Sequence, residues 1–155
     1  MVGVWALVAL VVDQLAKWAV RLGIDPGESV ALIGQVVRLT HVTNTGAAFG
    51  LFSGQTALFV AATAAVVTMA VLLASRLRSS DQAALAGLGL ASGGAAGNLA
   101  DRLRLGAVVD FIDVGAWPVF NLADAAIVTG VGLLMWHLVR APRRAGVRAS
   151  PPAQP

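Results

Sequence analysis

Apolar residues along the chain gather into four long stretches that are separated by shorter polar segments. The stretches lie near residues 3–22, 56–75, 83–100 and 121–140. Each is close to the roughly 20 residues that a helix needs to cross about 30 Å of hydrocarbon. The pattern therefore predicts an all-α membrane protein with four transmembrane helices, which form one domain over residues 1–140.

The remaining segments are polar or mixed. Residues 29–43 are rich in Val, Leu, Ile and Thr, with Gly34-Gln35 as a candidate turn, so a short hairpin or small sheet is predicted there. Residues 101–120 form a second outer segment, which carries most of the acidic residues. The tail over 141–155 is rich in Pro and Arg, a composition that predicts disorder.

Composition supports a membrane protein, because 57% of the residues are hydrophobic and only 12% are charged, against about a quarter charged in soluble domains. The chain has no Cys, which excludes disulfides, a cysteine nucleophile and thiolate metal sites. Its basic residues form no stripe with interleaved aromatics, so no nucleic-acid partner is predicted. The first apolar stretch lacks a basic leader and a cleavage pattern, and is expected to remain as a helix.

The basic residues predict an orientation, because short cytoplasmic loops are enriched in Lys and Arg. The link between the second and third stretches carries Arg76 and Arg78, and further arginines follow from Arg140 onward. In a four-span chain these two regions lie on the same side. Both termini are therefore expected in the cytoplasm, with residues 23–55 and 101–120 outside.

Three glycines in the third stretch, Gly89, Gly93 and Gly97, recur every fourth residue and line one helix face. Small residues at this spacing let a neighbouring helix approach closely. Tight packing alone explains the pattern, and such packing would also hold the polar groups at the outer end of the helix rigidly.

Two polar motifs precede the acidic segment. Asp13 and Lys17 are four residues apart on one helix face and can form an ion pair. That pair is either structural, with Lys17 reaching to the interface, or it braces the outer segment or touches a substrate. Asn44 and Gly46 follow the predicted hairpin, where a small residue lets backbone groups approach a ligand, although an ordinary turn fits equally well.

A third motif ends the third stretch. Asn98, Asp101 and Arg102 fall at i, i+3 and i+4 and share a helix face. A pair between Asp101 and Arg102 either caps the helix at the interface or belongs to a shell. Such a shell would orient catalytic groups or hold the polar backbone of a substrate.

Four of the seven aspartates, Asp101, Asp110, Asp113 and Asp124, lie within one short span, although ionisable groups are costly at the edge of hydrocarbon. The connection from Asp110 to Asp124 is short enough to bring both carboxylates to the same outer edge. Two close carboxylates share one proton, and such a pair can hydrolyse an amide. Asp124 could instead cap its own helix, where Asn121 shares its face, and Asp113 could be a solvated loop acid.

Other hydrolytic chemistry finds little support. His41 and His137 lie far apart in the predicted topology, and no nucleophilic triad is visible. A metal would have to rest on carboxylates alone, which suits Mg²⁺ or Ca²⁺.

Taken in order, these motifs resemble the lipoprotein signal peptidase family, also called signal peptidase II or prolipoprotein signal peptidase. The resemblance covers nearly the whole chain except the tail. Five motifs carry it: Asp13-Gln14 with Lys17, Asn44 with Gly46-Ala47-Ala48-Phe49, Gly97-Asn98 with Asp101-Arg102, Val109-Asp110-Phe111, and Phe120-Asn121 with Ala123-Asp124.

The resemblance implies an intramembrane aspartic endopeptidase of the bacterial cytoplasmic (inner) membrane, with its active site at the outer face. It would remove the signal peptide of a prolipoprotein just before a Cys that carries diacylglycerol, so its implied partners are this substrate and membrane lipid. By resemblance, Asp110 and Asp124 are the catalytic pair. The residues implied in binding or support are Asn44, Gly46, Asn98, Asp101, Arg102, Asn121, Asp13 and Lys17. The family fold has four membrane helices with a small extracytoplasmic β-cradle and uses no metal or organic cofactor.

Two departures from the family pattern are small. Ala16 stands where the family often has a hydroxyl residue, and the loop between Asp110 and Asp124 is short for a cover over the site. A small proton- or cation-coupled transporter is the main alternative, since intramembrane Asp and Lys also mark ion paths; the absence of a broken inverted repeat speaks against it. The third hypothesis is a non-catalytic subunit of a membrane assembly.

Overall fold

The computed structural model describes residues 1–34, 36–46, 56–78 and 80–140. The expected disorder of the tail and the Ala47-Ala48-Phe49 part of the second motif lie outside the described residues. In chain order the elements are α1 (Val2–Gly23), β1 (Ser29–Ile33), β2 (Val37–Asn44), α2 (Thr56–Ala74), α3 (Gln82–Leu105), β3 (Val108–Asp113) and α4 (Leu122–Arg140).

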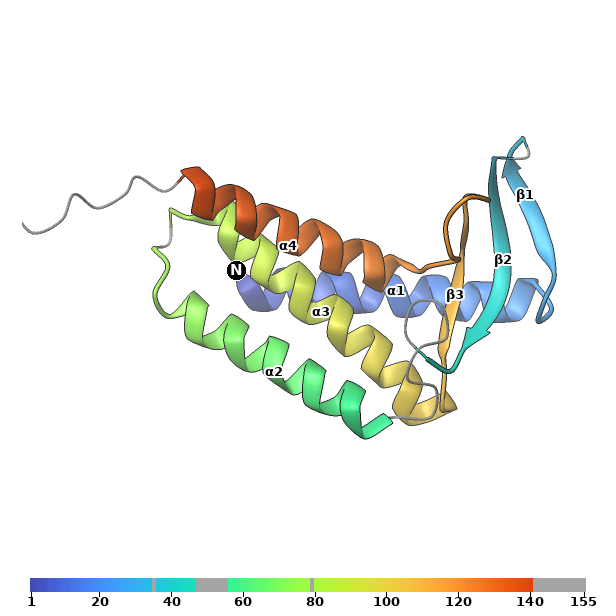
Figure 1. Ribbon diagram of the computed structural model, residues 1–155, viewed down its shortest axis with the longest axis horizontal. Coiled ribbons are helices and arrows are strands. Elements are labelled where there is room, and N and C mark those ends of the chain that lie inside the picture. Colours follow the sequence, from blue (N-terminus) through green and yellow to red (C-terminus); the bar gives the residue numbers. More distant parts are fainter. Residues whose placement is uncertain (35, 47–55, 79, 141–155) are drawn as a thin grey trace, which may run out of the picture.

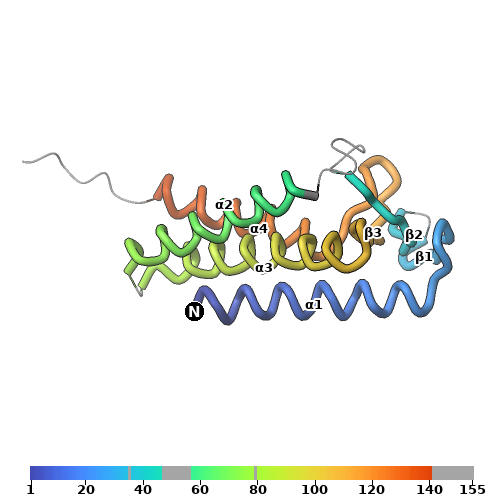
Figure 2. The backbone as a smooth tube through the Cα atoms, turned by 90° about the horizontal axis from the view of Figure 1, so that it is seen from below, coloured from blue at the N-terminus to red at the C-terminus, as the bar shows by residue number. Residues whose placement is uncertain are grey.

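The four helices lie side by side, and the sheet stands across one end of the bundle (Figure 1). The N-terminus, the link from α2 to α3 and the last turn of α4 lie at the opposite end. Figure 2 shows α3 as the central helix, with α1 on one side and α2 and α4 on the other. Helix α3 is therefore the element that every part of the bundle shares.

Three helices are long and apolar enough to cross a membrane: Val2–Gly23, Ala57–Ala74 and Leu122–Arg140. Their surfaces are largely exposed apolar side chains, as expected of helices that face lipid. The central helix α3 differs because it is rich in Gly, Ala and Ser and buries eleven of its residues against its neighbours. Its lower hydrophobicity fits its enclosed position, since its neighbours shield much of its surface.

The glycine face of α3 packs against α1. A Cβ on Gly93 would overlap the backbone of Ala6, and a Cβ on Gly97 would lie 2.8 Å from the Asp13 carboxylate. Close packing of this kind needs residues without side chains at the contact. The glycine spacing seen in the sequence therefore allows α1 to pack closely on α3. At Gly97, the glycine nearest the sheet, it lets the Asp13 carboxylate contact α3 directly.

The predicted hairpin is formed by β1 and β2, which pair antiparallel with Val30 opposite Leu39. The sequence did not predict the third strand, β3, which pairs antiparallel with β2 and gives the order β1-β2-β3. Strand β3 has Asp110 in its middle, so its acidic residues masked an otherwise apolar segment. Phe111 packs with Val20 and Ile24 and fixes the sheet to the end of α1.

Candidate active site

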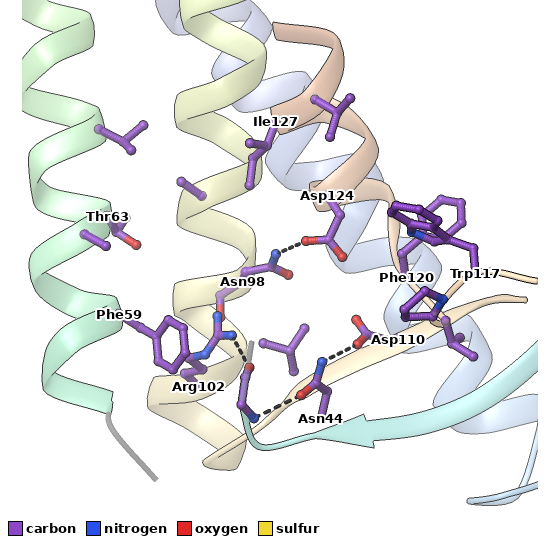
Figure 3. A pocket seen from close by; sticks show the side chains of 18 residues that line it. Asn44, Phe59, Thr63, Asn98, Arg102, Asp110, Trp117, Phe120, Asp124 and Ile127 are labelled. Atoms are coloured by element: carbon purple, nitrogen blue, oxygen red, sulfur yellow. Dashed lines mark hydrogen bonds between the residues drawn. The ribbon is translucent and has the colours of Figure 1, made fainter. Parts of the chain in front are cut away.

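Two aspartates from different elements line one cavity of about 480 Å³ beside the sheet. Asp110 comes from β3 and Asp124 from the first turn of α4. Figure 3 shows both carboxylates at this cavity, with Asn98 of α3 and Asn44 of β2 beside them. Four different elements thus place polar side chains around one space.

Asp110 is 3% exposed and accepts hydrogen bonds on both carboxylate oxygens. Asn121 Nδ2 donates to Oδ1 at 2.6 Å, and Asn44 Nδ2 donates to Oδ2 at 2.9 Å. Burial is the largest influence and raises the pKa of Asp110 to about 6; the two amide donors lower it and the nearby charge of Asp124 raises it. A carboxyl of this kind can hold a proton near neutral pH.

The Asp124 carboxylate makes hydrogen bonds both within α4 and at the cavity. Its Oδ2 accepts from the backbone N–H of Asn121 at 3.2 Å, while Asn121 Oδ1 accepts from the N–H of Asp124 at 2.9 Å. This reciprocal arrangement is a capping box, in which Asn121 is the N-cap of α4 and Asp124, in the first turn, completes the cap. Its Oδ1 meanwhile accepts from Asn98 Nδ2 at 2.7 Å at the cavity.

Two amides join the carboxylates into one network. Asn121 is fully buried, and its Nδ2 donates both to Asp110 and, at 3.0 Å, to Asn98 Oδ1. Asn98 in turn donates to Asp124. Because a neutral amide supplies hydrogen bonds without a counter-charge, this network fixes the acids in position with no ion pair to either among the described residues.

A second buried group, the lysine cluster, consists of Asp13, Lys17 and Asp101. Lys17 Nζ contacts Asp13 Oδ2 at 2.9 Å and Asp101 Oδ2 at 3.0 Å, so the predicted ion pair of Asp13 and Lys17 is formed. Its third contact, at 2.9 Å, is Asn98 Oδ1. Asp13 Oδ1 also accepts from the backbone N–H of Ala123 at 2.8 Å. The cluster therefore ties α1, α3 and α4 together directly behind the amide network.

Gln14 completes the lysine cluster, although sequence reasoning gave it no role of its own. Its Nε2 donates to Asp101 Oδ1 at 3.0 Å and to the carbonyl of Gly97 at 3.2 Å. The sequence did contain a signal for this role, because Gln14 stands next to Asp13 in the first motif. A polar side chain next to a buried charge on the helix needs a partner inside the bundle.

Arg102 does not pair with Asp101 among the described residues, and this prediction was wrong. Adjacent helix positions point about 100° apart, so Asp101 faces Lys17 while Arg102 turns toward the cavity. The Arg102 guanidinium lies 3.8 Å above the Phe59 ring of α2, and its Nη2 donates to the Gly46 carbonyl at 2.8 Å. Its Nε is buried with no hydrogen-bond partner in the described part of the chain.

Two other candidate residues, Asp113 and His41, make hydrogen bonds that stabilise the fold. Asp113 belongs to β3 and accepts from Arg38 at 2.5 Å and from the N–H of Gly115 at 2.8 Å, so the description as a solvated loop acid was wrong. The Gly115 hydrogen bond, followed by that of Arg38, lowers the pKa of Asp113. His41 is buried, with its Nδ1 2.7 Å from the Ile24 carbonyl oxygen. Within the described residues, no group of three His, Cys, Asp or Glu side chains could hold a metal ion.

Comparisons with known proteins show relatives in sequence and in fold. A family model described as signal peptidase (SPase) II matches residues 5–140. A lipoprotein signal peptidase of Moorella thermoacetica is 50% identical over 86% of this chain and 89% of the relative, and one from Pelotomaculum thermopropionicum is 48% identical over 85% and 87%. A solved structure described as a bacterial membrane enzyme has a TM-score of 0.83 at 29% identity, covering 88% of this chain and 86% of that chain.

Proposed function

The chain belongs to the signal peptidase II family, whose members remove signal peptides from prolipoproteins, and we propose that Asp110 and Asp124 perform this cleavage as an aspartic pair. One observation supports the proposal above all. Both carboxylates line the same cavity and rest on amide and backbone donors, with no ion pair to either among the described residues.

The pair can divide the work of amide hydrolysis. Ionised Asp124 takes a proton from a water, whose oxygen attacks the scissile carbonyl carbon, while protonated Asp110 hydrogen-bonds the carbonyl oxygen. Collapse of the tetrahedral intermediate breaks the C–N bond, and the proton held by the pair passes to the leaving amine. The raised pKa of Asp110 supports it as the proton holder.

The cavity suits a substrate that is polar at one end and apolar along its length. Its polar end has Asn44, Arg102 and the two acids, and its wall between α2 and α4 has Val66 and Ile127 among other apolar side chains. The buried Nε of Arg102, which has no hydrogen-bond partner among the described residues, is available to a substrate carbonyl. The proposed substrate is a diacylglyceryl-modified prolipoprotein that is cut before its lipidated Cys, with the lipid lying along this wall.

The proposed placement has all four helices crossing the bacterial cytoplasmic membrane. The end of the bundle with Arg76, Arg78 and Arg140 would face the cytoplasm together with the termini. The sheet, serving as an extracytoplasmic β-cradle, and the acid pair would lie at the outer face. Arg76 and Arg78 lie on the link from α2 to α3 and Arg140 ends α4, at the end of the bundle opposite the sheet (Figure 1).

Processing of a lipid-modified precursor in a gel-shift assay tests the proposal. Asp110→Asn and Asp124→Asn should each abolish cleavage while the protein still inserts and folds. Asp25→Asn is the matched control, because Asp25 is an exposed acid near the same end of the bundle. Full activity in either dyad variant would exclude the aspartic mechanism, and a transporter would process no precursor at all.

A further inference from the structure

A second cavity, of about 320 Å³, lies on the other flank of α3. We call it the α1–α3 groove, and it shares no lining residue with the cavity of the acid pair. The residues that line it from α1 are Val11, Gln14, Leu15, Lys17, Trp18 and Arg21, and those from the rest of the chain are Asp101, Arg104, Leu105 and Val109. It is therefore separate from the proposed path of the substrate.

The wall of the groove is an exposed apolar stripe on α1. Val11, Leu15 and Trp18 recur at i, i+4 and i+7, so they share one helix face, and their side chains are 43%, 58% and 61% exposed. Leu105 of α3 borders the same space. An apolar stripe of this length fits an acyl chain, and a Trp near a helix end is typical of the membrane interface.

The end of the groove nearest the sheet is cationic. Three basic residues line it against one acid, Asp101. Lys17 is not available to a ligand, because its three contacts hold Asp13, Asp101 and Asn98. The remaining cations are the two arginines. Arg21 is exposed and forms no ion pair among the described residues, and Arg104, whose side chain is 62% exposed, contacts Asp101 at 3.4 Å.

Arg104 is already oriented by the protein. Its Nε donates to the Ala100 carbonyl at 3.3 Å, and its Nη2 contacts Gln14 and, at 3.4 Å, Asp101. These contacts orient the guanidinium at the mouth of the groove, and Nη1, which has no partner in the described part of the chain, can bind a further acceptor. Guanidinium groups match the oxygens of a phosphate in geometry as well as in charge.

We propose that the α1–α3 groove binds an anionic phospholipid of the outer leaflet. The phosphate lies between Arg21 and Arg104, and an acyl chain follows the stripe of Val11, Leu15 and Trp18. The proposal rests on the membrane placement given above, which puts the sheet end of the bundle at the outer face. A free phosphate would leave the apolar stripe unused, and a zwitterionic lipid would not match the two cations.

Native mass spectrometry of the full-length protein in detergent tests the groove with phosphatidylglycerol as the probe. The protein should retain one molecule, and Arg21→Gln should weaken retention about fivefold, as expected for one basic residue near an anionic surface. Arg21 is the first choice because it makes no ion pair within the described ranges of the chain, so its replacement should not disturb the fold. Arg140→Gln is the matched control, since that arginine ends α4 and stacks on Trp136 at the other end of the bundle.

Two comparisons complete the test. Phosphatidylcholine with the same acyl chains, and glycerol 3-phosphate without chains, should both be retained more weakly than phosphatidylglycerol. Equal retention of phosphatidylglycerol by Arg21→Gln and the unaltered protein, or equal retention of either comparison compound, would overturn the proposal. Asp110→Asn should bind phosphatidylglycerol normally while losing cleavage, so failure of the lipid site and failure of the peptidase proposal are distinguishable.

Discussion

The molecule places two pairs of aspartates on opposite flanks of α3 and surrounds them differently; Asp13, Asp101 and Asp110 are buried, and Asp124 is half-buried. Asp13 and Asp101 share the ammonium group of Lys17, at 2.9 and 3.0 Å. Asp110 and Asp124 have amide and backbone partners only, within the described residues. The Lys17 cation offsets the charge of the first pair, so the lysine cluster stabilises the packing of the helices; we also call this cluster the brace. Neutral amides cannot offset a charge in this way, and burial therefore raises the pKa of Asp110 to about 6.

Asn98 links the two pairs. Its Oδ1 accepts from both Lys17 and Asn121, so its Nδ2 is directed toward Asp124. The brace thus reaches the proposed reaction centre through a single side chain. If this comparison is right, changes in the brace act on folding first, and changes in the acid pair act on chemistry first.

The largest expected effect on activity comes from the acid pair. Asp124→Asn keeps the shape of the side chain and removes the carboxylate that accepts a proton from water, and losses on the order of 10²- to 10⁴-fold are typical of a missing acid or base. Initial rates of precursor cleavage measure this loss. Unfolding temperature in detergent should change little; a collapse of stability would assign Asp124 to the brace instead.

The largest expected effect on stability comes from Lys17→Met. The substitution leaves two carboxylates buried without their cation, and breaking a buried pair in this way costs roughly 3–5 kcal/mol. Thermal or denaturant unfolding in detergent measures it. Lys17→Arg, which keeps the charge, should recover part of the loss, whereas a Met variant as stable as the parent would contradict the assignment as a brace.

Asn98→Leu separates positioning from folding. It removes the donor to Asp124 and leaves buried polar groups unsatisfied, which costs about 1–3 kcal/mol. Cleavage should fall by about 10- to 100-fold, the range seen when an outer-shell partner of a functional group is lost. Asn98→Asp keeps the acceptor for Lys17 and loses the donor to Asp124, so cleavage should fall by at least as much.

Activity should depend on the proton of Asp110. Since its pKa is raised to about 6, cleavage should decline as the pH rises through that value. Asn44 donates to the ionised carboxylate and lowers this pKa, so Asn44→Ala should move the declining limb to higher pH. A pH–rate profile tests the direction, and a shift to lower pH would contradict the role of Asn44. The stability contribution of a raised carboxyl pKa is present at low pH and is lost as pH passes about 6.

The smallest effect is expected at Asp113, which belongs to neither pair. Arg38→Gln removes its partner, whose side chain is 44% exposed, and exposed ion pairs contribute little. Cleavage should remain within about twofold of the parent. A large loss of cleavage would indicate that Asp113 also contributes to the active site, and would contradict the division of the acids into two pairs.

Local rules carried much of the prediction. Residue spacing alone placed Asp13 with Lys17 and put Asn121 on the face of Asp124, because helix periodicity fixes which side chains are neighbours along one helix. Apolar length predicted the helices, and the order of the motifs carried the family resemblance. Strand β3 was not predicted because its acidic residues interrupt the apolar alternation. Whether those acids are buried depends on partners from other elements.

Tertiary structure decided which acid meets which partner. The sequence offered Arg102 as the neighbour of Asp101, yet close packing of α1 on the glycine face of α3 supplied Lys17 instead. The chain by itself determined a membrane bundle with four clustered aspartates. Only the packing of helices and sheet sorted those aspartates by partner, because the free energy of a buried charge depends on its surroundings in space and not along the chain.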